Sequence, residues 1–337
     1  MINLKSSRNI IIQFIFIFLL FISFISQVYS EENNATSNNN KEKTKEENQN
    51  IENNKKPNET IKLPINLYDS LTFSSKNSVY VRSAALFSLP AIYFTYGFYK
   101  WNWGSVDYFH IKPEEPFNIN SDAGDADKYG HLFGTYAFTR FGYFMLKSTG
   151  LSKNESLFYG AVYAEAMMLF SEIGDGFTKY YGFDPYDVLF NNLGILVGVL
   201  LAYFPMIDNI FAFQWEYIPT RYMRERIEKL RVPPVITDYS GQKYFITIKP
   251  AGIPHVSLTP LRYINLDFGF FSRGYYPSKY YDSETRNYFF GISANFSILS
   301  GELLPAGYLS STMQTIFNYY HLPWDIEAKK WEISRIE

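Results

Sequence analysis

The sequence predicts an α+β protein, in which a membrane-associated bundle of about four helices is followed by a small antiparallel sheet and a C-terminal helix. Four apolar segments, each close to 20 residues long, precede residue 205, and alternating segments follow residue 239. Aromatic residues make up 19% of the chain. Such side chains suit surfaces that are apolar at one end and wet at the other, as at a membrane boundary.

Composition excludes several kinds of partner and site. The chain has 337 residues, a net charge of -2 and no cysteine. Disulfides, thiol catalysis and thiolate zinc sites are therefore excluded. The charge offers no basic surface, so nucleic acid is not an expected partner. We expect membrane lipid as a partner, with an envelope protein as a second candidate.

The N-terminus is predicted to be a targeting segment. Lys5 and Arg8 precede an apolar run over residues 10–25, and Ser30 follows as a small residue before a polar stretch. These are the parts of a secretory signal peptide, with cleavage expected after Ser30. The run also approaches membrane-spanning length, so residues 1–30 are either a signal peptide or an anchor. Both interpretations predict a periplasm-facing, membrane-associated protein of the cell envelope, at the inner or the outer membrane.

The rest of the chain divides by composition. Residues 31–66 are polar and predict a disordered tether. Residues 67–212 form the predicted helical membrane-associated domain, residues 213–238 a basic linker, and residues 239–337 a small β-rich region with a C-terminal helix. The expected helices cover residues 79–99, 127–148, 153–175, 185–204 and 306–320, and the expected strands cover residues 242–249, 263–271 and 288–299.

Local motifs support the helix boundaries. Ser152 and Glu155 form a capping-box pattern at the start of the third helix. Pro185 suits the first turn of the fourth helix. Gly194 and Gly198 have the G-x-x-x-G spacing that permits close approach between helices.

Polar residues concentrate at the predicted helix ends. Antiparallel packing places the start of the second helix, the end of the third and the start of the fourth at one end of the bundle. These ends carry the candidate site residues Asp127, Lys128, His131, Glu172, Asp175, Asp187 and Asn191. Carboxylates and a histidine that converge in this way can bind a divalent metal or act as acid and base. The alternative is a purely structural role, in which the hydrogen-bonded cluster fixes the register of the helices.

Four of these residues are the candidate metal ligands: Asp127, His131, Glu172 and Asp175. Lys128 is expected to neutralise Asp175 or Asp187. The other three histidines, His110, His255 and His321, are distant in sequence, and we interpret them as surface or packing residues.

The same residues resemble a known family. Residues 124–131 (GDADKYGH), 172–176 (EIGDG), 182–187 (GFDPYD) and 191–194 (NNLG) are similar to the YfiM-like predicted periplasmic lipoproteins, a domain of unknown function. A looser similarity links the opening D-K-x-x-H pattern to VanZ-like membrane proteins. The resemblance implies an envelope location and a helical core, and it implies no reaction. The chain departs from the lipoprotein description because it contains no cysteine to carry a lipid.

Two functions are consistent with these patterns. The first is a structural or accessory component of the envelope, associated with a membrane and without a defined biochemical activity. The alternative is a metal-dependent hydrolase or transferase that acts on a lipid or cell-wall precursor.

Overall fold

The computed structural model describes residues 76–118, 121–228, 235–275, 283–305 and 308–334. Within these residues it shows helices and a five-stranded antiparallel sheet, so the predicted α+β class is confirmed. The predicted signal peptide or anchor (residues 1–30) and tether (residues 31–66) lie outside the described residues.

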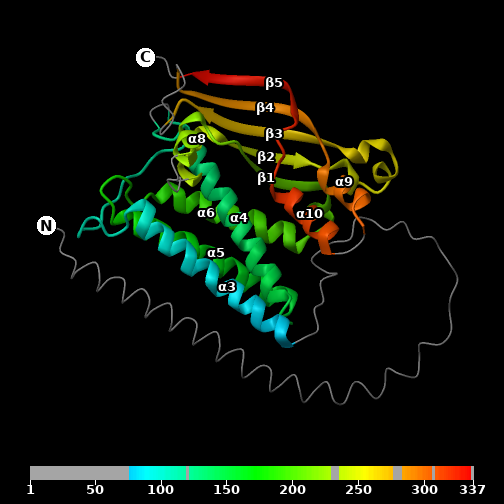
Figure 1. Ribbon diagram of the computed structural model, residues 1–337, viewed down its shortest axis with the longest axis horizontal. Coiled ribbons are helices and arrows are strands. Elements are labelled where there is room, and N and C mark those ends of the chain that lie inside the picture. The colour runs from blue at the N-terminus through cyan, green and yellow to red at the C-terminus, as the bar shows by residue number, and fades with distance from the viewer. Residues whose placement is uncertain (1–75, 119–120, 229–234, 276–282, 306–307, 335–337) are drawn as a thin grey trace. The chain divides into compact units, whose positions relative to one another are not determined.

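The predicted helices are present with small shifts at their ends. They are α3 (Lys76–Tyr96), α4 (Ala126–Lys147), α5 (Lys153–Gly176), α6 (Pro185–Tyr203) and α10 (Tyr308–Tyr319). Shorter helices are α7 (Pro205–Ile210), α8 (Arg221–Glu228) and α9 (Phe296–Leu303). A π-helical turn over Gly97–Trp101 continues α3. Figure 1 shows α4 and α6 on the side of the bundle that meets the sheet, with α3 and α5 farther from it.

Side-chain caps explain where the bundle helices begin. Ser152 and Glu155 make the reciprocal hydrogen bonds of a capping box at the start of α5. The Asp184 carboxylate accepts a hydrogen bond from the Tyr186 amide at the start of α6. Helix α4 follows Gly124 and Asp125, which both adopt positive φ. A Cβ atom on Gly124 would lie 2.3 Å from the ring of Tyr275, so the turn packs directly against the sheet region.

The glycine pair on α6 allows close contact with α4. A Cβ atom on Gly194 would lie 2.3 Å from the Leu132 carbonyl oxygen, and one on Gly198 would lie 2.8 Å from Thr139 Cβ. The G-x-x-x-G spacing therefore serves a helix contact within this chain. The contact holds the starts of α4 and α6 side by side.

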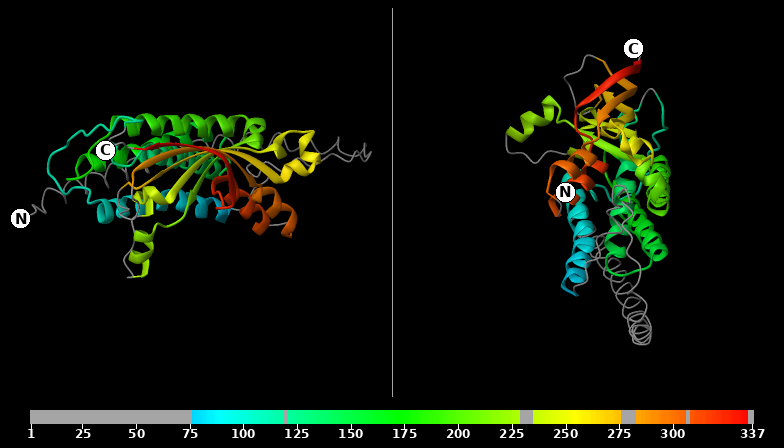
Figure 2. Two further views of the ribbon diagram at one scale, coloured as in Figure 1. Left: turned by 90° about the horizontal axis from the view of Figure 1, so that it is seen from above. Right: turned by 90° about the vertical axis from the view of Figure 1, so that its right-hand side faces the viewer.

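The sheet has the strand order β1-β2-β3-β4-β5, with every neighbouring pair antiparallel. Its strands are β1 (Phe211–Tyr217), β2 (Gln242–Ile248), β3 (Ile264–Arg273), β4 (Thr285–Ala294) and β5 (Asp325–Ser334). The predicted strands 242–249 and 263–271 correspond to β2 and β3. The predicted strand 288–299 corresponds to β4 only over its first part, because residues 296–303 form α9. The edge strands β1 and β5 lie outside the predicted strands, and most of β1 and all of α8 fall within the predicted basic linker, residues 213–238. Figure 1 labels the five strands in this order, and Figure 2 shows the sheet in two further views.

The two faces of the sheet differ in chemistry. On one face, Tyr244, Phe270 and Phe213 form a core cluster with Ala126, Tyr136 and Leu201 of the helices. On the other face, Phe245, Phe271 and Phe289 form a small buried cluster, and buried polar residues surround it: Gln214, Glu216, Thr247, Asn265, Asp267, Asn287 and His321. The apolar face therefore joins the sheet to the bundle, and the polar face carries a separate buried network.

Candidate metal centre

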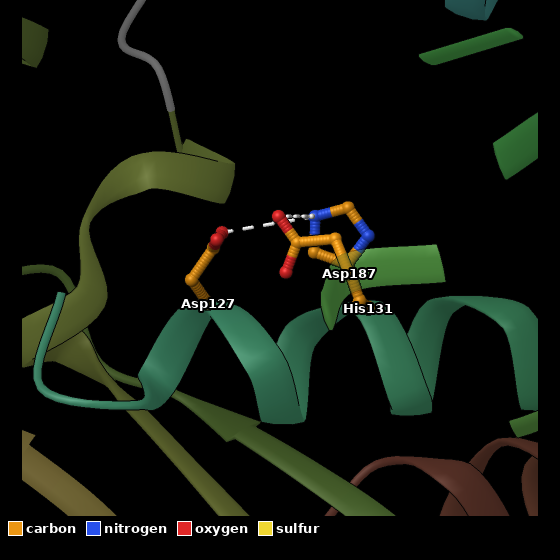
Figure 3. A group of neighbouring side chains, drawn as sticks. All are labelled: Asp127, His131 and Asp187. Carbon is orange, nitrogen blue, oxygen red and sulfur yellow. Dashed lines mark ion pairs between the residues drawn. The ribbon is translucent and has the colours of Figure 1, made fainter. Parts of the chain in front are cut away.

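Three helix ends meet at the polar end of the bundle, as the predicted topology requires. Asp127 and His131 lie one turn apart on α4, and Asp187 lies in the first turn of α6. Figure 3 shows the two carboxylates directed toward the imidazole ring of His131. One oxygen of each carboxylate and one ring nitrogen lie within 4.8 Å of one another.

Lys128 fixes the orientation of these carboxylates from behind. Its Nζ lies 2.7 Å from Asp187 Oδ1, 2.6 Å from Asp184 Oδ2 and 3.7 Å from Asp127 Oδ2. The side chain is only 2% exposed, so the ion pairs are well shielded from water. In both Asp127 and Asp187, one oxygen faces Lys128 and the other faces His131.

The ring of His131 is fixed from its other nitrogen. Nδ1 lies 3.1 Å from Asn191 Oδ1 and 3.4 Å from Glu172 Oε1. Asn191 Oδ1 also accepts a hydrogen bond from the hydroxyl of Thr135 at 2.9 Å. An oxygen that accepts both contacts places the proton of a neutral imidazole on Nδ1, which leaves a lone pair on Nε2. Histidine ligands of metals are held in the same way, by a carboxylate or carbonyl oxygen on the second nitrogen.

The distances around Nε2 suit a shared cation better than hydrogen bonds. Nε2 lies 3.8 Å from Asp127 Oδ1 and 3.7 Å from Asp187 Oδ2. Both separations exceed the 2.7–2.9 Å typical of a charge-assisted hydrogen bond. Ligands about 2.1 Å from a tetrahedral metal are separated by about 3.4 Å. Asp127 and His131 are 23% and 14% exposed, so this side is the less shielded side of the cluster.

Electrostatics show a surplus of negative charge in the cluster. Burial would lower the pKa of His131, but Asp187, Glu172 and Asp127 raise it to about 9. Burial raises the pKa of Asp187 to about 7, and the nearby carboxylates of Asp127 and Asp184 add to this effect. Burial would also raise the pKa of Asp127, but His131, Lys128 and a hydrogen bond from Tyr239 together lower it. A proton or another cation among the carboxylates therefore stabilises the cluster.

Glu172 and Asp175, predicted as metal ligands, do not belong to the group of three ligand atoms formed by Asp127, His131 and Asp187. Glu172 is 1% exposed, and its Oε2 accepts a hydrogen bond from the Asp184 amide. Burial raises its pKa well above the ordinary value, although His131 opposes the effect. Asp175 accepts a hydrogen bond of 2.7 Å from Trp103 Nε1, and burial raises its pKa to about 7. Asp187 therefore takes the third position next to Asp127 and His131, while Glu172 supports the ring.

The remaining predicted residues lie in the same cluster. Lys128 forms the expected ion pair with Asp187, and its second partner is Asp184 rather than Asp175. Asn191 contacts His131 as described above. Among the other histidines, His255 is exposed, whereas His321 is 4% exposed and packs on the polar face of the sheet.

Sequence reasoning missed several residues that complete the site. Asp184 receives Lys128 as well as the amides of Glu114 and Tyr186. The position of Asp184 directly before Pro185, typical of a helix cap, could have indicated it. Tyr239 donates a hydrogen bond of 3.0 Å to Asp127 from the region of the sheet. Trp103 and Tyr239 are not among the predicted site residues, because both are far from the cluster in sequence.

A buried ion pair ties the start of α4 to the sheet. Asp125 Oδ2 lies 2.9 Å from Arg286 of β4, and both side chains are almost fully buried. Asp125 also accepts a hydrogen bond from the Phe117 amide. The pair connects the sheet to the turn that places Asp127, two residues later.

Comparison with known proteins gives one family. Residues 114–203 match the DUF2279 family, described as predicted periplasmic lipoproteins. The predicted resemblance to periplasmic proteins of unknown function is confirmed over this stretch, and its description fits a protein of the cell envelope. The matched stretch contains all seven predicted site residues. The comparisons give no support for the looser similarity to VanZ-like proteins. No curated protein and no solved structure matches the chain.

Proposed function

We propose that this envelope protein binds a divalent metal ion through Asp127, His131 and Asp187, and that the site serves hydrolysis or group transfer. The observation that carries the proposal is the convergence of three ligand atoms within 4.8 Å on the less shielded side of the cluster. Among the two predicted functions, this geometry supports the metal-dependent enzyme better than a purely structural cluster.

The ligand set favours a borderline cation such as Zn²⁺. Two carboxylate oxygens and one imidazole nitrogen are ligands of catalytic zinc sites, which keep a further position for water. A metal in such a site lowers the pKa of its bound water toward 7 and so supplies a nucleophile. Asn191 and Glu172 orient His131, and Lys128 orients the two aspartates. A lipid or cell-wall precursor with an ester or phosphoester bond is the substrate class that agrees with an envelope location.

Metal analysis of the purified full-length chain tests the proposal. After loading with Zn²⁺ and removal of free metal, we expect His131→Ala to lose one equivalent that the wild type retains. Asp187→Asn, which keeps the shape of the side chain, should weaken Zn²⁺ binding in the same direction. His255→Ala replaces an exposed histidine and serves as the matched control. Equal zinc content in the wild type and in a folded His131→Ala variant would overturn the proposal.

A second observation favours association with a membrane. Large apolar side chains recur on one face of α6 and are 40–53% exposed: Leu189, Leu193, Leu196, Leu200 and Tyr203. Met206 and Ile207 on α7 continue the exposed apolar surface. Within the described part of the chain, a single helix, α6, is long and apolar enough to cross a membrane. We propose that this apolar stripe lies against membrane lipid, since such extended apolar patches are uncommon on monomeric soluble proteins.

Carbonate extraction of the native envelope tests the stripe. We expect the wild type to remain with the membranes and the double variant Leu196→Gln/Leu200→Gln to move toward the soluble fraction. Leu303→Gln changes an exposed leucine on α9, outside the stripe, and should leave the distribution unchanged. Retention of the double variant at the wild-type level would show that the stripe does not hold the protein to the membrane.

A further inference from the structure

The polar face of the sheet carries a second cluster with the composition of a metal site. Glu216 belongs to β1, Asp325 begins β5, and His321 lies in the segment between α10 and β5. One oxygen from each carboxylate and one ring nitrogen of His321 lie within 4.8 Å of one another. This cluster lies outside the stretch that matches the DUF2279 family.

The chain crosses the sheet to build this cluster. Tyr320 forms a bridge with Trp215 of β1, and the His321 amide donates to the Trp215 carbonyl oxygen. Five residues after Tyr320, Asp325 pairs with Ser293 of β4. The crossing segment therefore brings residues from both edges of the sheet to one place.

The imidazole of His321 is held in a fixed orientation. Its ring stacks on Phe245 with centroids 3.9 Å apart and an interplanar angle of 8°. Nε2 lies 3.5 Å from Asp267 Oδ2, and the other oxygen of Asp267 accepts a hydrogen bond from Thr247. Nδ1 is thereby directed to Glu216 Oε2, also at 3.5 Å. A carboxylate on one ring nitrogen and an acceptor-rich cluster at the other is the arrangement of a metal-bound histidine.

Buried atoms in the cluster lack hydrogen-bond partners within the described part of the chain. These atoms are Glu216 Oε2, Asp267 Oδ2 and both ring nitrogens of His321. The three residues are 1%, 0% and 4% exposed. Each ring nitrogen of His321 faces one of these carboxylate oxygens at 3.5 Å, which is longer than a charge-assisted hydrogen bond and compensates the buried carboxylates only weakly. Both separations are close to the distance of about 3.4 Å between ligands that share a tetrahedral metal.

One lysine faces three of the four carboxylates in this network. Lys243 Nζ lies 3.2 Å from Glu327, 3.4 Å from Asp325 and 3.8 Å from Glu216. Asp267 is the fourth carboxylate, on the far side of the His321 ring. Lys243 balances one negative charge, so the cluster keeps a surplus that a divalent cation can neutralise.

We propose that Glu216, His321 and Asp325 bind a second divalent cation, with Zn²⁺ as the ion that this ligand set favours. The ligands are far less exposed than those at the bundle end, so the second site is structural. It ties the segment after α10, and with it edge strand β5, to β1. This inference is independent of the proposed function of the first site.

Zinc stoichiometry of the full-length chain tests the inference. We expect two equivalents in the wild type, one in His131→Ala, one in His321→Asn and none in the double variant. In the His131→Ala background, EDTA should lower the melting temperature, because only the structural site remains to be emptied. Glu216→Gln keeps the stacked ring and should also lose one equivalent. His255→Asn is the control for adventitious histidine binding.

The outcomes separate the two sites. Zinc content that falls with His131→Ala but not with Glu216→Gln or His321→Asn would overturn the second site and leave the first intact. Zinc content that falls only with the Glu216 and His321 variants would support the second site and contradict the first. If His321→Asn does not fold, Glu216→Gln decides the question.

Discussion

The two clusters use the same residue types in different surroundings. At the bundle end, Lys128 faces Asp127, Asp184 and Asp187 next to His131. On the sheet, Lys243 faces Glu216, Asp325 and Glu327 near His321. In the first cluster the lysine is 2% exposed and the histidine 14%, while in the second the histidine is 4% exposed and the lysine 13%. This difference is why we propose a site that solvent reaches at the bundle end and a structural site on the sheet.

The largest expected effect comes from removing the lysines. Lys128→Met leaves Asp184 and Asp187 buried without their counter-charge, and we expect a loss of about 3–5 kcal/mol in the free energy of unfolding. Lys243→Met should cost less, roughly 1–2 kcal/mol, because the Lys243 side chain is 13% exposed whereas that of Lys128 is 2% exposed. Urea unfolding followed by tryptophan fluorescence measures both. Equal losses would contradict the contrast in shielding between the clusters.

A smaller effect tests the helix contact on which the first cluster depends. Gly194→Ala introduces a Cβ atom into contact with the Leu132 carbonyl oxygen, and we expect a loss of about 1–3 kcal/mol. Gly134→Ala is the matched control, since the nearest atom to its new Cβ lies 3.8 Å away. The control should be neutral, or stabilising by about 0.5–1 kcal/mol through helix propensity. A neutral Gly194→Ala would show that α4 and α6 can separate without cost.

The smallest effect concerns pH, measured in EDTA. The pKa of Asp175 is raised from its unfolded value to about 7 by burial. The folded state therefore binds more protons than the unfolded state between about pH 4 and pH 7, and stability falls as pH rises through this window. Asp175→Asn removes this loss while its amide oxygen can still accept from Trp103.

The comparison of two pH values gives the readout for Asp175. We expect Asp175→Asn to be more stable than the wild type at pH 8, by an amount on the order of 1 kcal/mol, and the difference to vanish near pH 4. Asp107→Asn, at an exposed aspartate, should show no such trend. A constant difference at both pH values would mean that Asp175 does not titrate as its burial implies.

Sequence patterns predicted most of the helical half. Caps at Ser152 and Asp184, the proline at position 185 and the apolar periodicity act within a few residues, so they are readable along the chain. Antiparallel packing of consecutive helices then placed Asp127, Glu172 and Asp187 at one end without further information. Which carboxylate joins Asp127 and His131 in the proposed metal site could not be predicted, because it depends on how far α5 and α6 each project toward His131.

The sheet cluster was beyond the reach of sequence reasoning. His321 is interpreted from the sequence as a surface or packing residue, because it is distant in sequence from the polar cluster at the bundle end. Its partners come from β1, β3 and β5, and two of these residues are more than 50 positions away. Strand pairing brings them together, and no local pattern records that pairing.

The sequence by itself determined the α+β class, the bundle helices and the set of polar residues at their ends, because turns, caps and periodicity are local properties. The tertiary structure decided which oxygen of each carboxylate faces His131, where Lys128 is buried, and that a second cluster exists at all. These features depend on contacts between distant residues and on the exclusion of water, which only the packed chain provides.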